Sequence, residues 1–399
     1  MKKLISISLI VFLMLALMVG CGGSTTPVVE ENGDEDTGDM PVVTIGVFQP
    51  QSGDNGAGGK QELLGTLYAN ELEPTVDIDG VTYLVKLEIV DNQSSPTYAP
   101  SAAQQLVAAG SSLILGSYGS AVCIAASDVF ADAGIPAIGI TCTNPAVTLD
   151  NDHYFRICFL DPFQGTVLAN FAKNKFGAEK AYVLAKLGDD YAVGLANYFK
   201  AAFGEENCMY ETFPEGNSDY AAYVDNAITY GADVFFSPVS TEAAALIIDQ
   251  AVTKNIGIPL LAGDTWDSNV ILNAAEGKDV EIFVTTFYQE GAAPEFDSGF
   301  RAFINSSPAN LAMNGGDDKI AAVSAMGFDG YFVALEALRV AGTTDSSVIL
   351  DILWDVTWTG ASGPIAFDSV GDALRSTAIV KWCNPDTGEW EFYAEQGVN

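Results

Sequence analysis

The stretch 112–165 constrains the fold of this chain most, because strand-like apolar runs and helix-like segments alternate along it. Leu113–Leu115 is a short apolar run typical of a buried strand, and 135–140 is a second. Between them the spacing predicts a helix over 121–130, with Ser120 as its N-cap. Alternation of this kind predicts parallel strands joined by covering helices.

The same alternation continues on both sides of this stretch. Strand-like runs occur at 42–48, 83–90, 180–186, 208–213, 233–237 and 258–262. Helical patterns separate the later runs, over 190–203, 220–230 and 241–255. The chain is therefore expected to be an α/β protein with two Rossmann-like lobes, each a parallel sheet flanked by helices.

Hydroxyl-bearing residues stand where the strand at 135–140 ends, in the run Thr141-Cys142-Thr143. Ligands of open α/β sheets bind at this carboxyl-terminal edge. The free N–H groups of a helix start, with Ser120 as its cap, suit a carboxylate. Ser120, Thr141 and Thr143 are therefore expected to lie side by side. The alternative is a pair of ordinary strand-to-helix turns that bind nothing.

Three motifs follow one another here: G-S-x-x-S before a helix that ends in S-D, then T-x-T-N-P, then Y-F-R-x-C-x-x-D-x-x-Q-G. Together they resemble the periplasmic ligand-binding proteins of the leucine/isoleucine/valine-binding type, which capture solutes for ABC importers. The resemblance covers nearly all of 42–393. It implies the type I periplasmic binding fold, in which three hinge strands join two lobes. It also implies that Ser120 takes the α-carboxylate of the ligand, while Thr141 and Thr143 take the α-ammonium.

The resemblance extends to the second lobe. The run 188–194 is similar to the family's D-x-x-Y-G motif, which implies that Tyr191 covers the ligand. The run 262–268 is similar to the loop whose acidic residue pairs with the ligand's ammonium; Asp264 is the first candidate and Asp267 the second. The ligand contacts expected in both lobes are Ser120, Thr141, Thr143, Tyr191, Asp264, Trp266, Tyr118, Asn55 and Asp267.

Several of these positions have plainer alternatives. Tyr191 could serve only in packing, and the Asp264 turn could be a solvated acidic loop. Asn55 and Gln61 are the polar candidates after the first strand, and both could equally be loop and surface residues. Trp266 is expected to be an apolar wall. Where some relatives place an aromatic residue over the ligand, this chain has Gly58.

Two segments indicate where the chain crosses between lobes. Asp161-Pro162-Phe163-Gln164 is a helix-start pattern with Asp161 as the N-cap. The run 362–372 is similar to the family's closing S-G-x-I-x-F-D-x-x-G-D. We therefore assign 42–159 and 289–361 to lobe 1, and 160–288 and 362–399 to lobe 2.

The first 41 residues are predicted to export and tether the protein. Residues 1–20 have two lysines before an apolar core, as a secretory signal peptide does, and Cys21 resembles the lipidated cysteine of bacterial lipoproteins. Residues 21–41 read as an acidic linker. The protein is expected to be extracytoplasmic, held at the cell membrane by its lipid alone; the alternative is a single transmembrane anchor.

The net charge of −35 excludes nucleic acid as a partner, because no basic face can be assembled. His153 is the only histidine and no C-x-x-C pair occurs, so no metal is expected. The glycines after the first strand lack the G-x-G-x-x-G spacing of a dinucleotide-binding loop, so no cofactor is expected. The G-x-S-x-G motif of a nucleophilic serine is missing, so the protein is not expected to be an enzyme.

The resemblance implies a binding protein, expected to be a monomer, that captures an amino acid of branched-chain type and delivers it to an ABC permease. A sensor subunit of the same fold is one alternative. A binder of amides, urea-like solutes or aromatic acids is another.

Five cysteines follow Cys21, so an odd number remains for disulfides unless all are reduced. Cys142 and Cys158 are expected to lie close together, with Cys123 as a possible third. The bridge of leucine-binding relatives is absent, because Ser94 and Gly119 occupy those positions.

Overall fold

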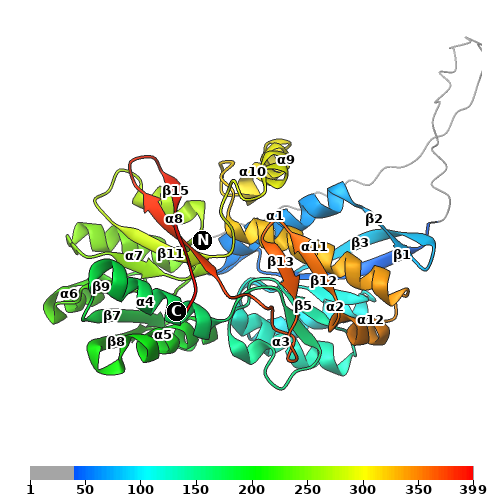
Figure 1. Ribbon diagram of the computed structural model, residues 1–399, viewed down its shortest axis with the longest axis horizontal. Helices are drawn as coiled ribbons and strands as arrows, with labels where there is room; N and C mark the ends of the chain where they lie inside the picture. The colour runs from blue at the N-terminus through cyan, green and yellow to red at the C-terminus, as the bar shows by residue number, and fades with distance from the viewer. Residues whose placement is uncertain (1–39, 399) are drawn as a thin grey trace, which may run out of the picture. The chain divides into compact units, whose positions relative to one another are not determined.

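The computed structural model describes residues 40–398, which form two lobes, each built on a sheet covered by helices (Figure 1). The predictions for the signal segment, for Cys21 and for most of the linker concern positions outside the described residues. None of the helices within 40–398 combines the length and the hydropathy needed to cross a bilayer.

Lobe 1 contains a six-stranded sheet within the described residues. Its strands lie in the order β2 (Thr75–Ile78), β3 (Val81–Asp91), β1 (Val42–Gln49), β4 (Leu113–Leu115), β5 (Ala137–Gly139) and β6 (Tyr154–Arg156). The β2–β3 pair is antiparallel and the other pairs are parallel. The strand–helix alternation of the sequence therefore forms the predicted parallel arrangement.

Lobe 2 contains a seven-stranded sheet, counted over residues 40–398. Its strands lie in the order β15 (Glu389–Gln396), β14 (Ala378–Asn384), β11 (Ile282–Thr286), β10 (Leu260–Ala262), β9 (Val234–Phe236), β7 (Ala181–Lys186) and β8 (Cys208–Phe213). The last two strands of the chain pair antiparallel at one edge. A small hairpin, β12 (Thr357–Gly360) with β13 (Gly363–Ala366), precedes them.

Helices cover both sheets. Those of lobe 1 are α1 (Gly56–Leu72), α2 (Ala99–Ala108), α3 (Ser120–Asp132), α9 (Pro294–Asn305), α10 (Pro308–Met313), α11 (Ala322–Ala341) and α12 (Ser346–Leu353). Those of lobe 2 are α4 (Asp161–Phe176), α5 (Asp190–Phe203), α6 (Ala221–Tyr230), α7 (Thr241–Thr253) and α8 (Asn269–Ala275). Short 3₁₀ turns lie at η1 (Pro145–Val147), η2 (Glu205–Asn207) and η3 (Asp264–Trp266).

Helices α1 and α11 approach each other closely because glycines face the partner helix. A β-carbon at Gly65 would collide with the backbone of Ser324, and one at Gly327 would collide with the backbone of Glu62. This contact buries the inner face of α1, including the carboxyl of Glu62, which is 0% exposed.

Two predicted helix caps are wrong by one residue. Gly119 is the N-cap of α3, with φ at 100°, and Ser120 is the first helical residue. The Ser120 hydroxyl instead accepts a hydrogen bond from the Asn144 N–H, at 3.1 Å. Leu160 is the N-cap of α4, so Asp161 lies in the first turn and makes no capping hydrogen bond. The Ser120 side chain is thus used in a tertiary contact, whereas the Asp161 carboxyl is buried without a hydrogen-bond partner among the described residues.

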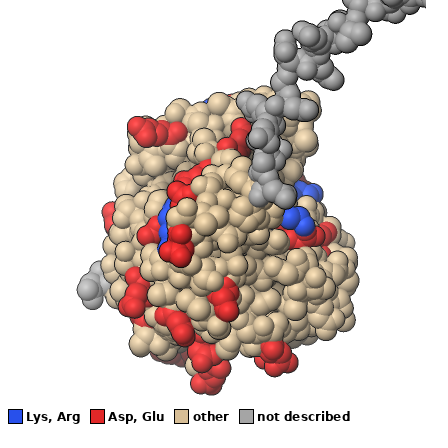
Figure 2. Space-filling view, turned by 90° about the vertical axis from the view of Figure 1, so that its right-hand side faces the viewer, with Lys and Arg blue, Asp and Glu red and all other residues tan. Residues whose placement is uncertain are grey.

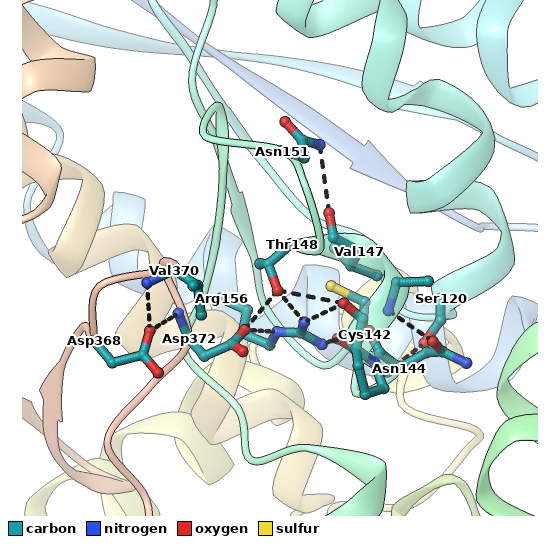
Figure 3. A network of polar contacts seen from close by, with 12 residues as sticks. Ser120, Cys142, Asn144, Val147, Thr148, Asn151, Arg156, Asp368, Val370 and Asp372 are labelled. Atoms are coloured by element: carbon teal, nitrogen blue, oxygen red, sulfur yellow. Dashed lines mark hydrogen bonds and ion pairs between the residues drawn. The ribbon is translucent and has the colours of Figure 1, made fainter.

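A buried guanidinium joins β6 to two other segments of the chain (Figure 3). The Arg156 side chain is 0% exposed, and its Nε lies 2.5 Å from Oδ1 of Asp372. Its remaining N–H groups donate to Thr148 Oγ1 and to the carbonyls of Cys142, Asn144 and Pro145. Every face of this cation is therefore satisfied, as burial requires.

Acidic side chains are spread over the face drawn in Figure 2, and Lys and Arg are sparse there. Most ion pairs within residues 40–398 are partly exposed; Lys254 with Asp225, at 2.6 Å, is an example. Such pairs contribute little to stability because water screens them.

Asp372→Ala should lower the free energy of unfolding by about 3–5 kcal/mol, because it leaves the buried guanidinium without its counter-ion. Asp225→Ala, the same change at an exposed pair, should cost about 0–1 kcal/mol. Urea unfolding of both variants measures the difference. Equal losses would contradict a special role for the Arg156 pair.

Candidate functional site

A cavity of about 390 Å³ lies between the two lobes. From lobe 1 its lining includes Asn55, Tyr118, Ser120 and Thr141. From lobe 2 its lining includes Lys186, Asp189, Tyr191, Asp264 and Thr265. Six of the nine residues expected to contact a ligand thus meet at one cavity: Asn55, Tyr118, Ser120, Thr141, Tyr191 and Asp264.

Parallel pairing of β4 with β5 brings the lobe 1 residues together. Leu115 pairs with Ile138, so the segments that follow these strands leave the sheet at the same edge. The first segment leads to Ser120 and the second to Thr141. The Asn144–Ser120 hydrogen bond ties the two segments to each other.

Tyr118 supplies an aromatic ring beside Gly58, the position where the sequence lacks the aromatic residue of some relatives. A β-carbon at Gly58 would collide with the Tyr118 ring, so the glycine makes room for it. The Tyr118 hydroxyl donates to the carbonyl of Thr265 at 3.4 Å, which links the lobes beside the cavity.

Asp264 lines this cavity from lobe 2, as the acidic residues Asp189 and Glu215 also do. It is 1% exposed, and its Oδ1 accepts hydrogen bonds from Gln164 Nε2 at 2.9 Å and from the Tyr191 hydroxyl at 3.0 Å. Burial raises the pKa of Asp264 to about 6, although these two hydrogen bonds oppose the shift. No cationic side chain within residues 40–398 forms an ion pair with it. A bound ammonium would supply the missing charge.

Thr143, Trp266 and Asp267 do not line the cavity. Thr143 lies behind it, beside the carboxyl of Asp161, whose pKa burial raises well above its usual range. Trp266 is fully buried in the core of lobe 2, and its indole N–H donates to Val239 O at 3.2 Å. These residues support the lining rather than form it.

Asp267 is already neutralised. Its Oδ2 lies 2.9 Å from Lys381 Nζ and accepts a hydrogen bond from Thr286 Oγ1 at 2.6 Å. The two acidic residues of this loop therefore differ: Asp267 has a cation of the protein, and Asp264 has none within the described part of the chain.

Sequence reasoning missed several contacts between the lobes. Lys186 Nζ lies 2.5 Å from Asp54 Oδ2 at the cavity lining, and Asn144 Nδ2 donates to Asp190 O at 2.7 Å. Gln61, expected as a candidate beside Asn55, donates to Asn269 Oδ1 at 3.1 Å instead of lining the cavity. No local pattern marks such pairs, because they exist only where the two lobes meet.

The cysteines at 123, 142, 158, 208 and 383 are free thiols. Cys123 and Cys142 share one apolar cluster, and Cys158 belongs to a second. The closeness of Cys142 and Cys158 stays a prediction. No group of three or more His, Cys, Asp or Glu residues within 40–398 is arranged to hold a metal ion.

A family model described as periplasmic binding protein matches residues 42–384. An amino acid binding protein of Pseudomonas aeruginosa is 32% identical over 212 residues, which are 51% of this chain and 56% of that protein. A Leu/Ile/Val-binding protein homolog of Brucella abortus is 25% identical over 357 residues, 88% of this chain and 93% of its own length. The match thus spans little more than half of the first relative.

Solved structures share the architecture. A leucine-binding protein from Thermotoga maritima has a TM-score of 0.78 and 30% identity, covering 89% of this chain and 99% of that one. A solute-binding protein of Rhodopseudomonas palustris in complex with 3,4-dihydroxybenzoic acid has a TM-score of 0.75 and 18% identity, covering 90% and 98%. The second likeness concerns the fold alone.

Asp264→Asn should raise the free energy of unfolding of the ligand-free protein at pH 7.5 by about 1–3 kcal/mol. The folded state binds the Asp264 proton more tightly than the unfolded state, so stability falls as pH rises from about 4 through 6 and stays lower above it. The gain should therefore disappear near pH 4. Urea unfolding at both pH values measures it.

Asp267→Asn is the matched control in the same loop. It removes the partner of a buried Lys381 and should cost about 3–5 kcal/mol at pH 7.5. If both variants lose stability alike at that pH, Asp264 is not an uncompensated charge.

Proposed function

We propose, because the chain belongs to the periplasmic binding protein family, that it captures an amino acid of branched-chain type between its lobes and delivers it to an ABC permease. The single observation that carries the amino-acid assignment is Asp264, a buried carboxyl without a cationic partner in the described part of the chain, which shares one cavity with the amino-terminal end of α3.

A zwitterion satisfies both ends of this cavity. Helix α3 begins at Ser120, and the N–H groups and positive dipole end of its first turn suit a carboxylate. Asp264 then pairs with the ammonium group, which compensates a charge that is costly to bury alone. The names of the Brucella relatives refer to leucine, isoleucine and valine, and a branched apolar side chain would lie against the Tyr118 and Tyr191 rings.

An aromatic acid is the second candidate, since the same two tyrosines line the cavity and a carboxylate would again lie at α3. Such a solute has no ammonium group, so it would leave Asp264 uncompensated. This difference favours the amino acid.

Proteins of this family act outside the cytoplasm. We further propose that Cys21 carries a lipid anchor after removal of 1–20, and that the protein is monomeric and non-catalytic. The lobe boundaries given above belong to the same proposal. Delivery to a permease distinguishes this role from that of a sensor subunit. Measurement of solute uptake by an ABC permease reconstituted with this protein would decide between the two roles.

Calorimetric titration of the processed protein should show binding of leucine, isoleucine or valine. Ser120→Ala should weaken it by roughly ten- to a hundredfold, because a hydrogen bond to a charged group is lost. Asp264→Asn should weaken it at least as much.

Ser127→Ala is the matched control, since it lies on the same helix with its hydroxyl bonded to Ile124 O; its affinity should equal that of the wild type. Absence of heat with every amino acid would refute the amino-acid assignment. If Asp264→Asn binds normally, Asp264 does not contact an ammonium group, and an aromatic acid becomes the favoured class of ligand.

A further inference from the structure

The carboxyl of Glu62 lies directly behind the lobe 1 side of the cavity. It belongs to α1 and is 0% exposed, held there by the close contact of α1 with α11. Its Oε2 is hydrogen-bonded to Thr141 Oγ1, and its Oε1 accepts from Gln49 Nε2. Thr141 lines the cavity, so Glu62 is one hydrogen bond away from a bound solute.

Gln49 connects the same carboxyl to a second lining segment. Its Oε1 accepts the Tyr118 N–H at 2.9 Å, and Tyr118 lines the cavity as well. Glu62 thereby holds together the two segments that follow β4 and β5. Because Gln49 Oε1 is committed to an N–H donor, the atom that faces Glu62 Oε1 is the amide nitrogen.

No Lys, Arg or His within residues 40–398 forms an ion pair with Glu62. The titratable groups that face it are Cys123 of α3, Asp264 of η3 and the Tyr118 hydroxyl. Burial raises the pKa of Glu62 to about 8, although the hydrogen bonds from Thr141 and Gln49 oppose the shift. The carboxyl is therefore mostly protonated at pH 7 and mostly ionised at pH 9.

The hydrogen bonds fix where this proton is. Oε1 faces an amide NH₂, which can only donate, so Oε1 remains an acceptor in both states. The proton must lie on Oε2, facing Thr141. A protonated Oε2 donates to Thr141 Oγ1 and frees the threonine hydrogen for the cavity. An ionised Oε2 takes that hydrogen, and Thr141 then presents only lone pairs.

We propose that Glu62 is a specificity-determining positioning residue, whose proton makes the Thr141 hydroxyl a hydrogen-bond donor to the carboxylate of the bound solute. This inference rests on the proposed function. It assigns the carboxylate to Ser120 and Thr141 together and leaves the ammonium to Asp264. Loss of the proton turns Thr141 into an acceptor and adds a negative charge behind the carboxylate subsite, so both effects oppose binding.

Affinity for leucine, measured by calorimetry, should fall roughly tenfold between pH 7 and pH 9 in the wild type, in proportion to the protonated fraction of Glu62. Glu62→Gln imitates the protonated state, because its amide oxygen can accept from Gln49 and its NH₂ can donate to Thr141. This variant should bind as the wild type does at pH 7 and retain that affinity at pH 9. Both proteins see the same ionisation of the leucine amino group, so the comparison cancels it.

Three further variants separate the causes. Glu88→Gln, a surface residue paired with Lys86, should keep the pH dependence of the wild type. Cys123→Ala should keep it too, since the thiol is not the group that titrates. Thr141→Val should bind more weakly at pH 7 and lose most of the dependence, because Glu62 acts through the missing hydroxyl.

If the affinity of Glu62→Gln falls between pH 7 and pH 9 as much as that of the wild type, the inference is overturned while the proposed function is left intact. An unchanged pH profile in Thr141→Val would overturn it too. If Glu62→Gln fails to fold, the number of protons that the wild type takes up on binding leucine tests the inference instead. Titration at pH 8 in buffers of different ionisation enthalpy should show uptake of about half a proton by the wild type, and none would refute the inference. If the wild type binds no carboxylate-bearing solute at all, the proposed function fails and takes this inference with it.

Discussion

The buried guanidinium of Arg156 is the interaction on which the position of the site depends. A cation removed from water is stable only when its N–H groups are satisfied, and here one carboxylate, one hydroxyl and three carbonyls do so. The carbonyls belong to the turn that follows Thr141, and the carboxylate belongs to Asp372, more than two hundred positions along the chain. The same turn reaches Ser120 through the Asn144 N–H (Figure 3). One buried charge therefore fixes the segment that carries the hydroxyls of lobe 1.

Three carboxyl groups are buried at or near the cavity, in a chain with a net charge of −35, and each has a different electrostatic environment. Asp267 is paired with Lys381, and Glu62 is positioned by two neutral hydrogen bonds and favours its proton. Asp264 has only hydrogen-bond donors around it, with no cation in the described part of the chain. The first arrangement is complete without a ligand. The last has no counter-charge among the described residues, and under the proposed function the ammonium group of the ligand supplies it.

Parts of this arrangement were predictable from local pattern. The apolar run Leu113–Leu115 and the glycine and hydroxyl residues after it gave the right strand and helix order, and parallel pairing then placed Ser120 near Thr141. The cap of α3 was predicted one residue late, because a serine near a helix start is normally assigned to capping, whereas this one is bonded to Asn144. Trp266 was expected to form an apolar wall because it lies in the same loop as Asp264, yet the 3₁₀ turn directs its indole into the core of lobe 2.

The sequence by itself determined the α/β class and the two lobes, because strand and helix periodicity are local properties, and the resemblance of its motifs to a known family indicated the loops from which a ligand site is built. Only the tertiary structure decided which acidic residue of 262–268 keeps an uncompensated charge, since that depends on where Lys381 falls in a strand far away in the chain. It also decided that Glu62 lies behind Thr141, because two glycines let α1 and α11 touch. Burial and charge pairing between distant segments have no periodic signature, and for that reason they become visible only once the chain is folded.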